Sequence, residues 1–155
     1  MKNLKHVGVA AFALVMSFST SAGAWGEGPF DNDDAQDWLM ECSRSAGAGT
    51  IAAAIDAALR PGYLEADAGS VAVAAAEVIA SADGKGLATT SADAAPCLAK
   101  TRSPEVRALT RRARQAITRV SDARSSELAQ LWSAGKSNRW AAGISQLATR
   151  LERQR

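Results

Sequence analysis

The sequence predicts an all-α protein, a single compact bundle of five to seven short helices closed by one disulfide. In several segments apolar residues recur every three or four positions, as on one face of a helix. Glycine and proline separate these segments, and no stretch alternates apolar and polar residues as a half-buried strand does. Two cysteines provide for one cross-link.

Residues 1–24 have the pattern of a secretory signal peptide. Lys2 and Lys5 precede an apolar run at residues 7–18, and Ala22-Gly23-Ala24 supplies small residues for cleavage. The run is shorter than the roughly 20 residues that span a bilayer, so no stable membrane anchor is expected. Cleavage after Ala24, or alternatively after Ala22, leaves one helical domain at residues 25–155 that is periplasmic or secreted.

Charge is divided unevenly along the remaining chain. Loss of Lys2 and Lys5 reduces the 18 basic residues to 16, which equals the number of acidic residues. Residues 25–99 hold 12 acidic and 3 basic residues, whereas residues 100–155 hold 4 acidic and 13 basic ones. We expect the two halves to attract each other across the fold. Zero net charge and export argue against a nucleic-acid partner.

The first helix is expected after an irregular lead-in at residues 25–30. Asp31 is the predicted N-cap, with Asp34 three residues on, and Phe30 and Ala35 form a predicted hydrophobic staple. One face of this helix is apolar and consists of Ala35, Trp38, Leu39, Cys42 and Ala46.

Two further helices are expected before residue 84. Thr50 is the predicted cap of the first, which ends at Pro61-Gly62, and Asp67 is the predicted cap of the second. Their predicted buried positions are Ile51, Ile55 and Leu59, and then Val71, Ala74, Val78 and Ala82. A loop is expected at residues 84–95.

A short helical turn is predicted at residues 96–98, and the basic half that follows predicts three longer helices. The first starts at Ser103-Pro104-Glu105, the second near Ser125, and the third at Ser137 or Asn138. Their apolar faces are Val106, Leu109, Ala113, Ala116, Ile117 and Val120; Leu128, Leu131 and Trp132; and Trp140, Ile144, Leu147, Ala148 and Leu151.

Cys42 and Cys97 allow one intramolecular disulfide. An oxidising compartment favours the bond, and two buried free thiols are the alternative. In the chain-entropy model, closing a loop of about 56 residues stabilises the fold by roughly 4 kcal/mol.

The stretch from Trp25 to Trp38 carries a long motif, W-G-x-G-x-F-D-N-D-D-A-x-D-W. With this motif the chain resembles a bacterial family of small helical domains whose function is unassigned. Weaker matches follow at residues 63–66, 74–80, 126–128, 131–132 and 140–151. The resemblance implies a common fold and supplies no catalytic mechanism. Family members usually begin close to Trp25, so this chain is similar to that domain placed behind a signal peptide.

The residues offer few routes to catalysis. His6, the only histidine, lies in the predicted signal peptide, which removes the usual catalytic base and any imidazole metal ligand from the remaining chain. No phosphate-binding glycine loop is present, and no cofactor is expected. Paired carboxylates could still hydrolyse cell-wall glycan, and the candidates are Glu27, Asp31, Asp37 and Glu77. Glu77 is more simply a solvated or salt-bridged helix position, and we expect no enzyme.

An acidic stripe is the sharper feature of the first helix. Asp33, Asp37 and Glu41 lie at i, i+4 and i+8, where like charges repel each other. Three counterparts remain open. The stripe could meet arginines of the basic half at positions 107, 111 and 114. A divalent cation could bind Asp31, Asp33, Asp34 and Asp37, or the exposed stripe could dock a basic partner.

The function that these observations favour is a non-enzymatic protein that binds another protein. Its specific form would be an immunity-type protein that neutralises a toxin acting in the periplasm. Trp25 and the acidic stripe are the candidate partner-binding residues, and the oligomeric state is left open by the sequence.

Overall fold

The computed structural model describes residues 26–45, 48–82, 95–100, 104–134 and 139–154, and their regular structure is entirely helical. The elements are α1 (Asp33–Arg44), α2 (Ala48–Leu59), α3 (Ala66–Ser81), α4 (Ala95–Lys100), α5 (Pro104–Arg107), α6 (Thr110–Val120), α7 (Glu127–Ser133) and α8 (Arg139–Glu152). The predicted all-α class is therefore confirmed. The described part has eight helices, more than predicted, because α4 is a full short helix and one predicted basic helix is divided into α5 and α6.

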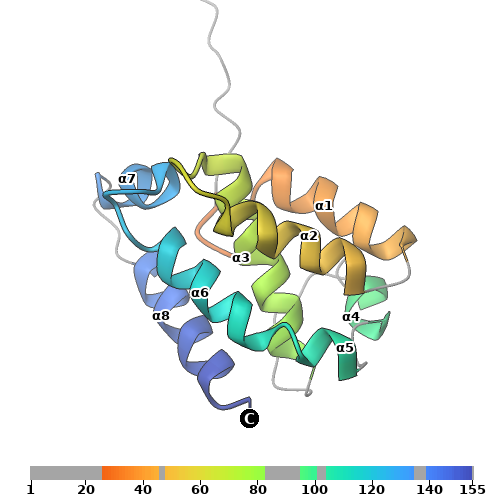
Figure 1. Cartoon of the computed structure of the whole chain (residues 1–155). Coiled ribbons are helices and arrows are strands. Elements are labelled where there is room, and N and C mark those ends of the chain that lie inside the picture. Colours follow the sequence, from red (N-terminus) through yellow and green to blue (C-terminus); the bar gives the residue numbers. More distant parts are fainter. Residues whose placement is uncertain (1–25, 46–47, 83–94, 101–103, 135–138, 155) are drawn as a thin grey trace, which may run out of the picture.

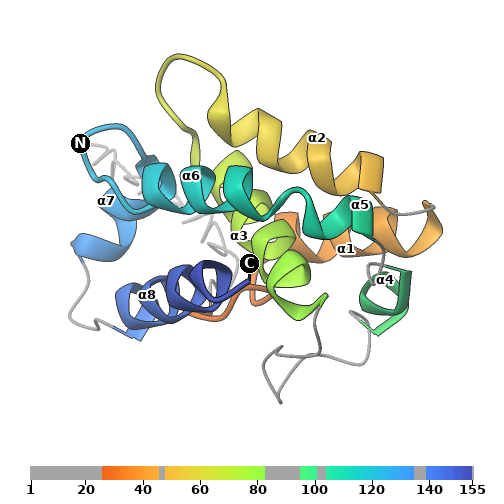
Figure 2. The ribbon, with the colours of Figure 1, turned by 60° about the horizontal axis from the view of Figure 1, so that its bottom comes forward.

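Helix α3 is the centre of the bundle (Figure 1), with α1, α2, α6 and α8 packed around it. Seen from below, α6 crosses α3 with α2 on one side and α8 on the other (Figure 2). Of its 16 residues, 12 are buried, and half of those 12 are alanines that let the neighbouring helices come close. Three of the four predicted core positions of this helix, Ala74, Val78 and Ala82, are buried, whereas Val71 is only half-buried. Burial also extends around the helix beyond the predicted face.

The predicted caps of α1 and α3 are corrected. Asn32, and not Asp31, caps α1 by accepting a hydrogen bond from the Ala35 N–H at 2.9 Å. Helix α3 begins at Ala66 without a side-chain cap from its own segment. Instead, Glu127 Oε2 on α7 accepts from the Ala66 N–H at 2.9 Å, across 61 residues. A remote carboxylate thus satisfies the positive end of the central helix.

Helix α2 also begins earlier than predicted, at Ala48, so Thr50 lies inside the helix and its hydroxyl bonds Ser45 Oγ at 2.8 Å. At the other end Arg119 of α6 donates to the carbonyls of Arg60 and Gly62. Gly62 has φ 110°, a value that side chains disfavour. The guanidinium therefore fixes the Pro61-Gly62 turn, where a cation complements the helix end.

The predicted basic helix is interrupted at residues 108–109. The Leu109 N–H bonds the Val106 carbonyl three residues back, and the Thr110 hydroxyl donates to the Arg107 carbonyl at 2.7 Å. At the junction between α5 and α6, these hydrogen bonds reach back three residues, whereas α-helical hydrogen bonds reach back four.

The C-terminal helices largely follow the prediction, with one correction. The core positions Trp140, Ile144, Leu147 and Leu151 are buried, but Leu131 is 53% exposed and does not point inward. Ser126 caps α7 and forms an isolated bridge to Leu64, which orients this short helix through the chain before α3.

The predicted disulfide between Cys42 and Cys97 is confirmed, and both cysteines are fully buried. It joins α1 to α4, with the two Cα atoms 5.3 Å apart. Among the described helices, none is long and apolar enough to cross a membrane. The predicted signal peptide, the loop at residues 84–95 apart from its last residue, and the helix starts at Ser103 and Ser137 or Asn138 lie outside the described residues.

Candidate binding cleft

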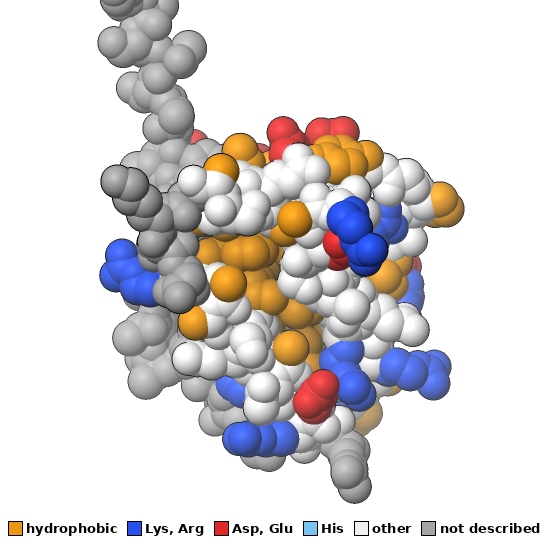
Figure 3. Space-filling model, turned by 90° about the vertical axis from the view of Figure 1, so that its left-hand side faces the viewer, with side chains coloured by type: hydrophobic (Ala, Val, Ile, Leu, Met, Phe, Trp, Pro, Cys, Tyr) orange, Lys and Arg blue, Asp and Glu red, His pale blue; other side chains and the backbone are white. Residues whose placement is uncertain are grey.

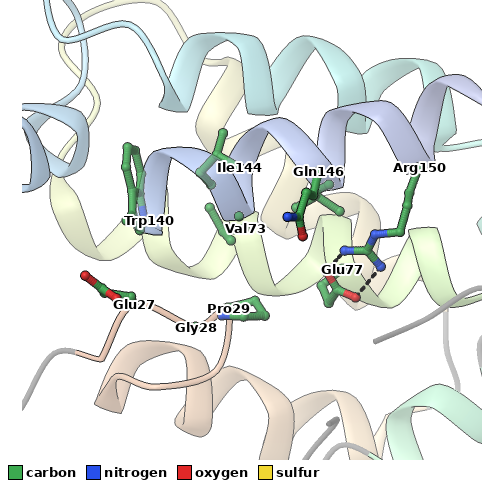
Figure 4. A pocket seen from close by; sticks show the side chains of 11 residues that line it. Glu27, Gly28, Pro29, Val73, Glu77, Trp140, Ile144, Gln146 and Arg150 are labelled. Atoms are coloured by element: carbon green, nitrogen blue, oxygen red, sulfur yellow. Dashed lines mark hydrogen bonds and ion pairs between the residues drawn. The ribbon is translucent and has the colours of Figure 1, made fainter. Parts of the chain in front are cut away.

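A small cleft lies where the segment 26–30 runs across the junction of α3 and α8 (Figure 4). Its lining is mainly apolar and comes from Pro29, Val73, Trp140, Ile144 and Leu147. Its volume is about 50 Å³, well below the roughly 300 Å³ at which small-molecule sites begin. A cleft of this size suits one small side chain better than a substrate.

The segment that lines one side of the cleft is held by Asp31. Asp31 Oδ2 accepts from the Gly28 N–H at 2.9 Å, and its carbonyl accepts from the Gly26 N–H at 2.9 Å. A Cβ atom at Gly26 or Gly28 would lie 2.3 or 2.5 Å from atoms of the Asp31 side chain. The two glycines of the opening motif therefore permit this close turn, and Asp31 fixes the segment instead of capping the helix.

Glu77 and Arg150 form a forked ion pair at one end of the cleft (Figure 4). Arg150 Nη1 donates to Glu77 Oε1 at 2.6 Å, and Nη2 donates to Oε2. Glu77 is 1% exposed, so the solvated alternative is wrong and the salt-bridged one is right, with the carboxylate buried and the guanidinium partly buried. The bidentate geometry fixes α8 against α3.

Glu27 lies at the other side of the same cleft. Its Oε2 forms an ion pair with Arg139 Nε at 2.6 Å, and the arginine side chain is 83% exposed. Two of the four candidate carboxylates, Glu27 and Glu77, thus line one cleft, and each is held by an arginine. Asp31 is engaged with Gly28, and Asp37 is exposed on α1, so neither lines the cleft.

An aromatic pair lies beside the cleft, and one of its rings, that of Trp140, belongs to the cleft lining. The rings of Trp132 and Trp140 are stacked with centroids 6.3 Å apart and planes 12° apart. Beside them a smaller hollow of about 10 Å³ is lined by Ser70, whose buried hydroxyl has no hydrogen-bond partner among the described residues. The sequence predicts the apolar positions of the tryptophans but does not point to Ser70 or Arg150, because no local pattern indicates these two residues.

The acidic stripe of α1 is exposed at Asp33, Asp37 and Glu41. Helix α1 packs against α2, α3 and α4, and within the described ranges no ion pair joins its three carboxylates to an arginine. Arg114 of α6 instead pairs with Glu152 at 3.6 Å, and Arg112 pairs with Asp56. The predicted internal pairing of the stripe with the basic helix is therefore not formed.

The divalent-cation site considered from the sequence would lie at the start of the same helix. Burial, Asp67 and the neighbouring Asp33 and Asp37 raise the pKa of the Asp34 carboxyl, in that order of effect. Within the described part of the chain, no three carboxylate, cysteine or histidine side chains come together as metal ligands. Trp25, the remaining candidate, lies outside the described residues.

Comparison with known proteins identifies a family but no individual related protein. A family model described as "Domain of unknown function (DUF4259)" matches residues 23–143, which include the opening motif. No curated protein and no solved structure matches. The sequence resemblance to a family of small helical domains is thereby confirmed, and the chain belongs to the DUF4259 family.

Proposed function

We propose that this protein is an exported, non-enzymatic module that binds another protein, and that the cleft beneath segment 26–30 seats a side chain of that partner. The observation that carries the proposal is the size and lining of the cleft, about 50 Å³ of mainly apolar wall bounded by arginine–glutamate pairs. Protein interfaces concentrate binding energy where one side chain enters such a pocket and a polar rim excludes water.

Export is supported by the signal-peptide pattern of residues 1–24 and by the buried disulfide, which suits an oxidising compartment. The specific form that we propose is an immunity-type protein that neutralises a toxin acting in the periplasm. Helices cross-linked and fixed by a buried ion pair present a pre-ordered surface, which lowers the entropic cost of binding.

A carboxylate-dependent glycan hydrolase is the second candidate, because Glu27 and Glu77 line the same cleft. Both carboxylates are engaged by arginines, and the space is far smaller than a sugar-binding subsite needs. A divalent-cation-binding role for the start of α1 has no ligand geometry in its favour among the described residues.

Gly143 provides the test, because it lines the cleft on α8 and a Cβ atom there meets nothing within 4 Å. A Cβ atom at this position has room, so we expect the side chain of Gly143→Gln to extend over the cleft mouth, and glutamine is a better helix former than glycine. The matched control is Ala142→Gln, on the adjacent exposed position outside the cleft lining.

The experiment is capture from a periplasmic extract, with bound proteins identified by mass spectrometry. We expect wild type and Ala142→Gln to retain the same partner and Gly143→Gln to lose it. Equal retention by the wild type and both variants would contradict the role of the cleft. Turnover of purified peptidoglycan by the wild type, abolished by Glu27→Gln, would instead establish the hydrolase.

A further inference from the structure

A second hollow opens on a different face, between α6 and α8. Its lining consists of Arg111, Arg114, Gln115, Thr118, Ala148 and Glu152, and its volume is about 290 Å³. We call it the basic groove. It shares no lining residue with the cleft beneath segment 26–30, so substitutions can address the two surfaces separately.

The groove has a net positive lining. Arg111 is exposed and has no ion-pair partner among the described residues, and Arg114 meets Glu152 only at 3.6 Å, with both side chains about half exposed. This separation is longer than a charge-assisted hydrogen bond. In Figure 3, which looks onto the left-hand side of Figure 1, several Lys and Arg side chains lie in the lower part of the face near one acidic side chain, and a hydrophobic band runs through its centre.

The acidic stripe of α1 has the opposite charge, and an apolar side chain lies near its C-terminal end. Met40 is 47% exposed and is one of three large hydrophobic side chains exposed in the described part of the chain. It lies between Asp37 and Glu41 in sequence, and both are exposed. An exposed methionine adapts readily to an irregular apolar surface.

The two surfaces match in length as well as charge. The stripe from Asp33 to Glu41 extends about 12 Å along its helix, and the α6 wall from Arg111 to Thr118 extends about 10 Å, at 1.5 Å per residue. The halves of the chain carry opposite charge, yet within the described residues the stripe is not neutralised by its own molecule. The complementary surface available to it is the groove of another copy.

We propose that α1 of one copy docks into the basic groove of a second copy, with Asp37 and Glu41 facing Arg111 and Arg114 and with Met40 directed at Ala148. The contact joins two different surfaces, so it is heterologous, and each copy retains one free stripe or one free groove. As the protein concentration rises, further copies therefore add head to tail.

Salt dependence is the first measurement, by sedimentation velocity over a series of protein concentrations. At about 0.01 M salt the Debye length is about 30 Å, and at about 1 M it is about 3 Å. We expect dimers and larger species to grow with concentration at low salt and to disappear at high salt. A single monomeric species throughout the low-salt series would overturn the proposal.

Two neutralised variants test the pairing itself. One carries Asp37→Asn with Glu41→Gln, and the other carries Arg111→Gln with Arg114→Gln. We expect each to be monomeric at low salt. An equimolar mixture joins the intact groove of the first to the intact stripe of the second, and growth stops at the heterodimer because the remaining surfaces are neutralised.

The matched controls are Glu105→Gln and Arg124→Gln, which remove exposed charges of the same kinds elsewhere. Both should associate as the wild type does, and melting temperatures should show that every variant is folded. A monomeric mixture, or equal loss of association in the controls, would refute the specific contact. Gly143→Gln should associate normally, so failure of the cleft proposal and failure of this one give different results.

Discussion

The carboxylate at Glu77 and those along α1 are the same chemical group in opposite surroundings. Glu77 is buried and accepts two hydrogen bonds from one guanidinium, so its charge specifies how α8 lies on α3. Asp33, Asp37 and Glu41 are exposed and have no ion pair within the described residues. A buried charge must be satisfied by the fold itself, whereas an exposed one remains available to another molecule.

The largest expected effect comes from breaking the buried ion pair between Glu77 and Arg150. Arg150→Met leaves the Glu77 carboxylate buried without its partner, which should lower the free energy of unfolding by about 3–5 kcal/mol. Urea denaturation, with the slope checked for two-state behaviour, measures this loss.

The control for that change is the double variant Glu77→Leu with Arg150→Met, which removes both charges and keeps an apolar contact. It should recover most of the lost stability. If Arg150→Met is as stable as the wild type, the ion pair does not hold α8 in place.

Removal of the disulfide should have the next largest effect. Cys42→Ser with Cys97→Ser opens a cross-link that spans 55 residues, and we expect a loss of about 2–4 kcal/mol in unfolding free energy. Because the bond joins α4 to α1, hydrogen exchange should rise first in α4 and in the part of α1 beneath it. Uniform acceleration across α3 and α8 would argue against this local role.

The N-cap of α1 contributes less. Asn32→Ala removes the acceptor for the Ala35 N–H and should cost about 1 kcal/mol. Asp67→Ala is the matched control at α3, where the predicted cap bonds only the adjacent Ala68 N–H and the start of the helix is satisfied by Glu127. Thermal unfolding of both variants should show the larger decrease for Asn32→Ala.

Sequence periodicity predicted the helices and most buried faces, because spacing along one helix is local information. Ala35, Trp38, Leu39 and Cys42 are buried as predicted, and so is the disulfide partner Cys97. Caps were less predictable because Asp and Asn are almost equally good at this position.

Contacts between distant segments decided what local patterns could not. Asp31 turns toward Gly28, which leaves Asn32 as the cap, and Glu127 reaches Ala66 across 61 residues. The pairing of Glu77 with Arg150 spans 73 residues, so nothing near either residue reveals that the glutamate is buried or that the cleft exists.

The smallest effect concerns the pH dependence of the acidic end of α1. Burial and neighbouring carboxylates raise the pKa of Asp34 above its ordinary value of 3.8. The folded state therefore binds this proton more tightly than the unfolded chain does, and the associated stability is present below pH 3.8 and is lost as the pH rises through the raised pKa. Asp34→Asn should raise the melting temperature slightly at neutral pH.

Asp122 supplies the control of opposite sign, because its hydrogen bonds from Arg124 lower the pKa of its carboxyl. That stability is present above the ordinary value and is lost as the pH falls through the lowered pKa, so Asp122→Asn should lower the melting temperature at neutral pH. Melting curves of both variants between about pH 3 and pH 7 compare the two groups. If Asp34→Asn behaves like Asp122→Asn, the negative charge of Asp34 is already compensated in the fold, and the repulsion from its stripe neighbours Asp33 and Asp37 does not destabilise the start of α1.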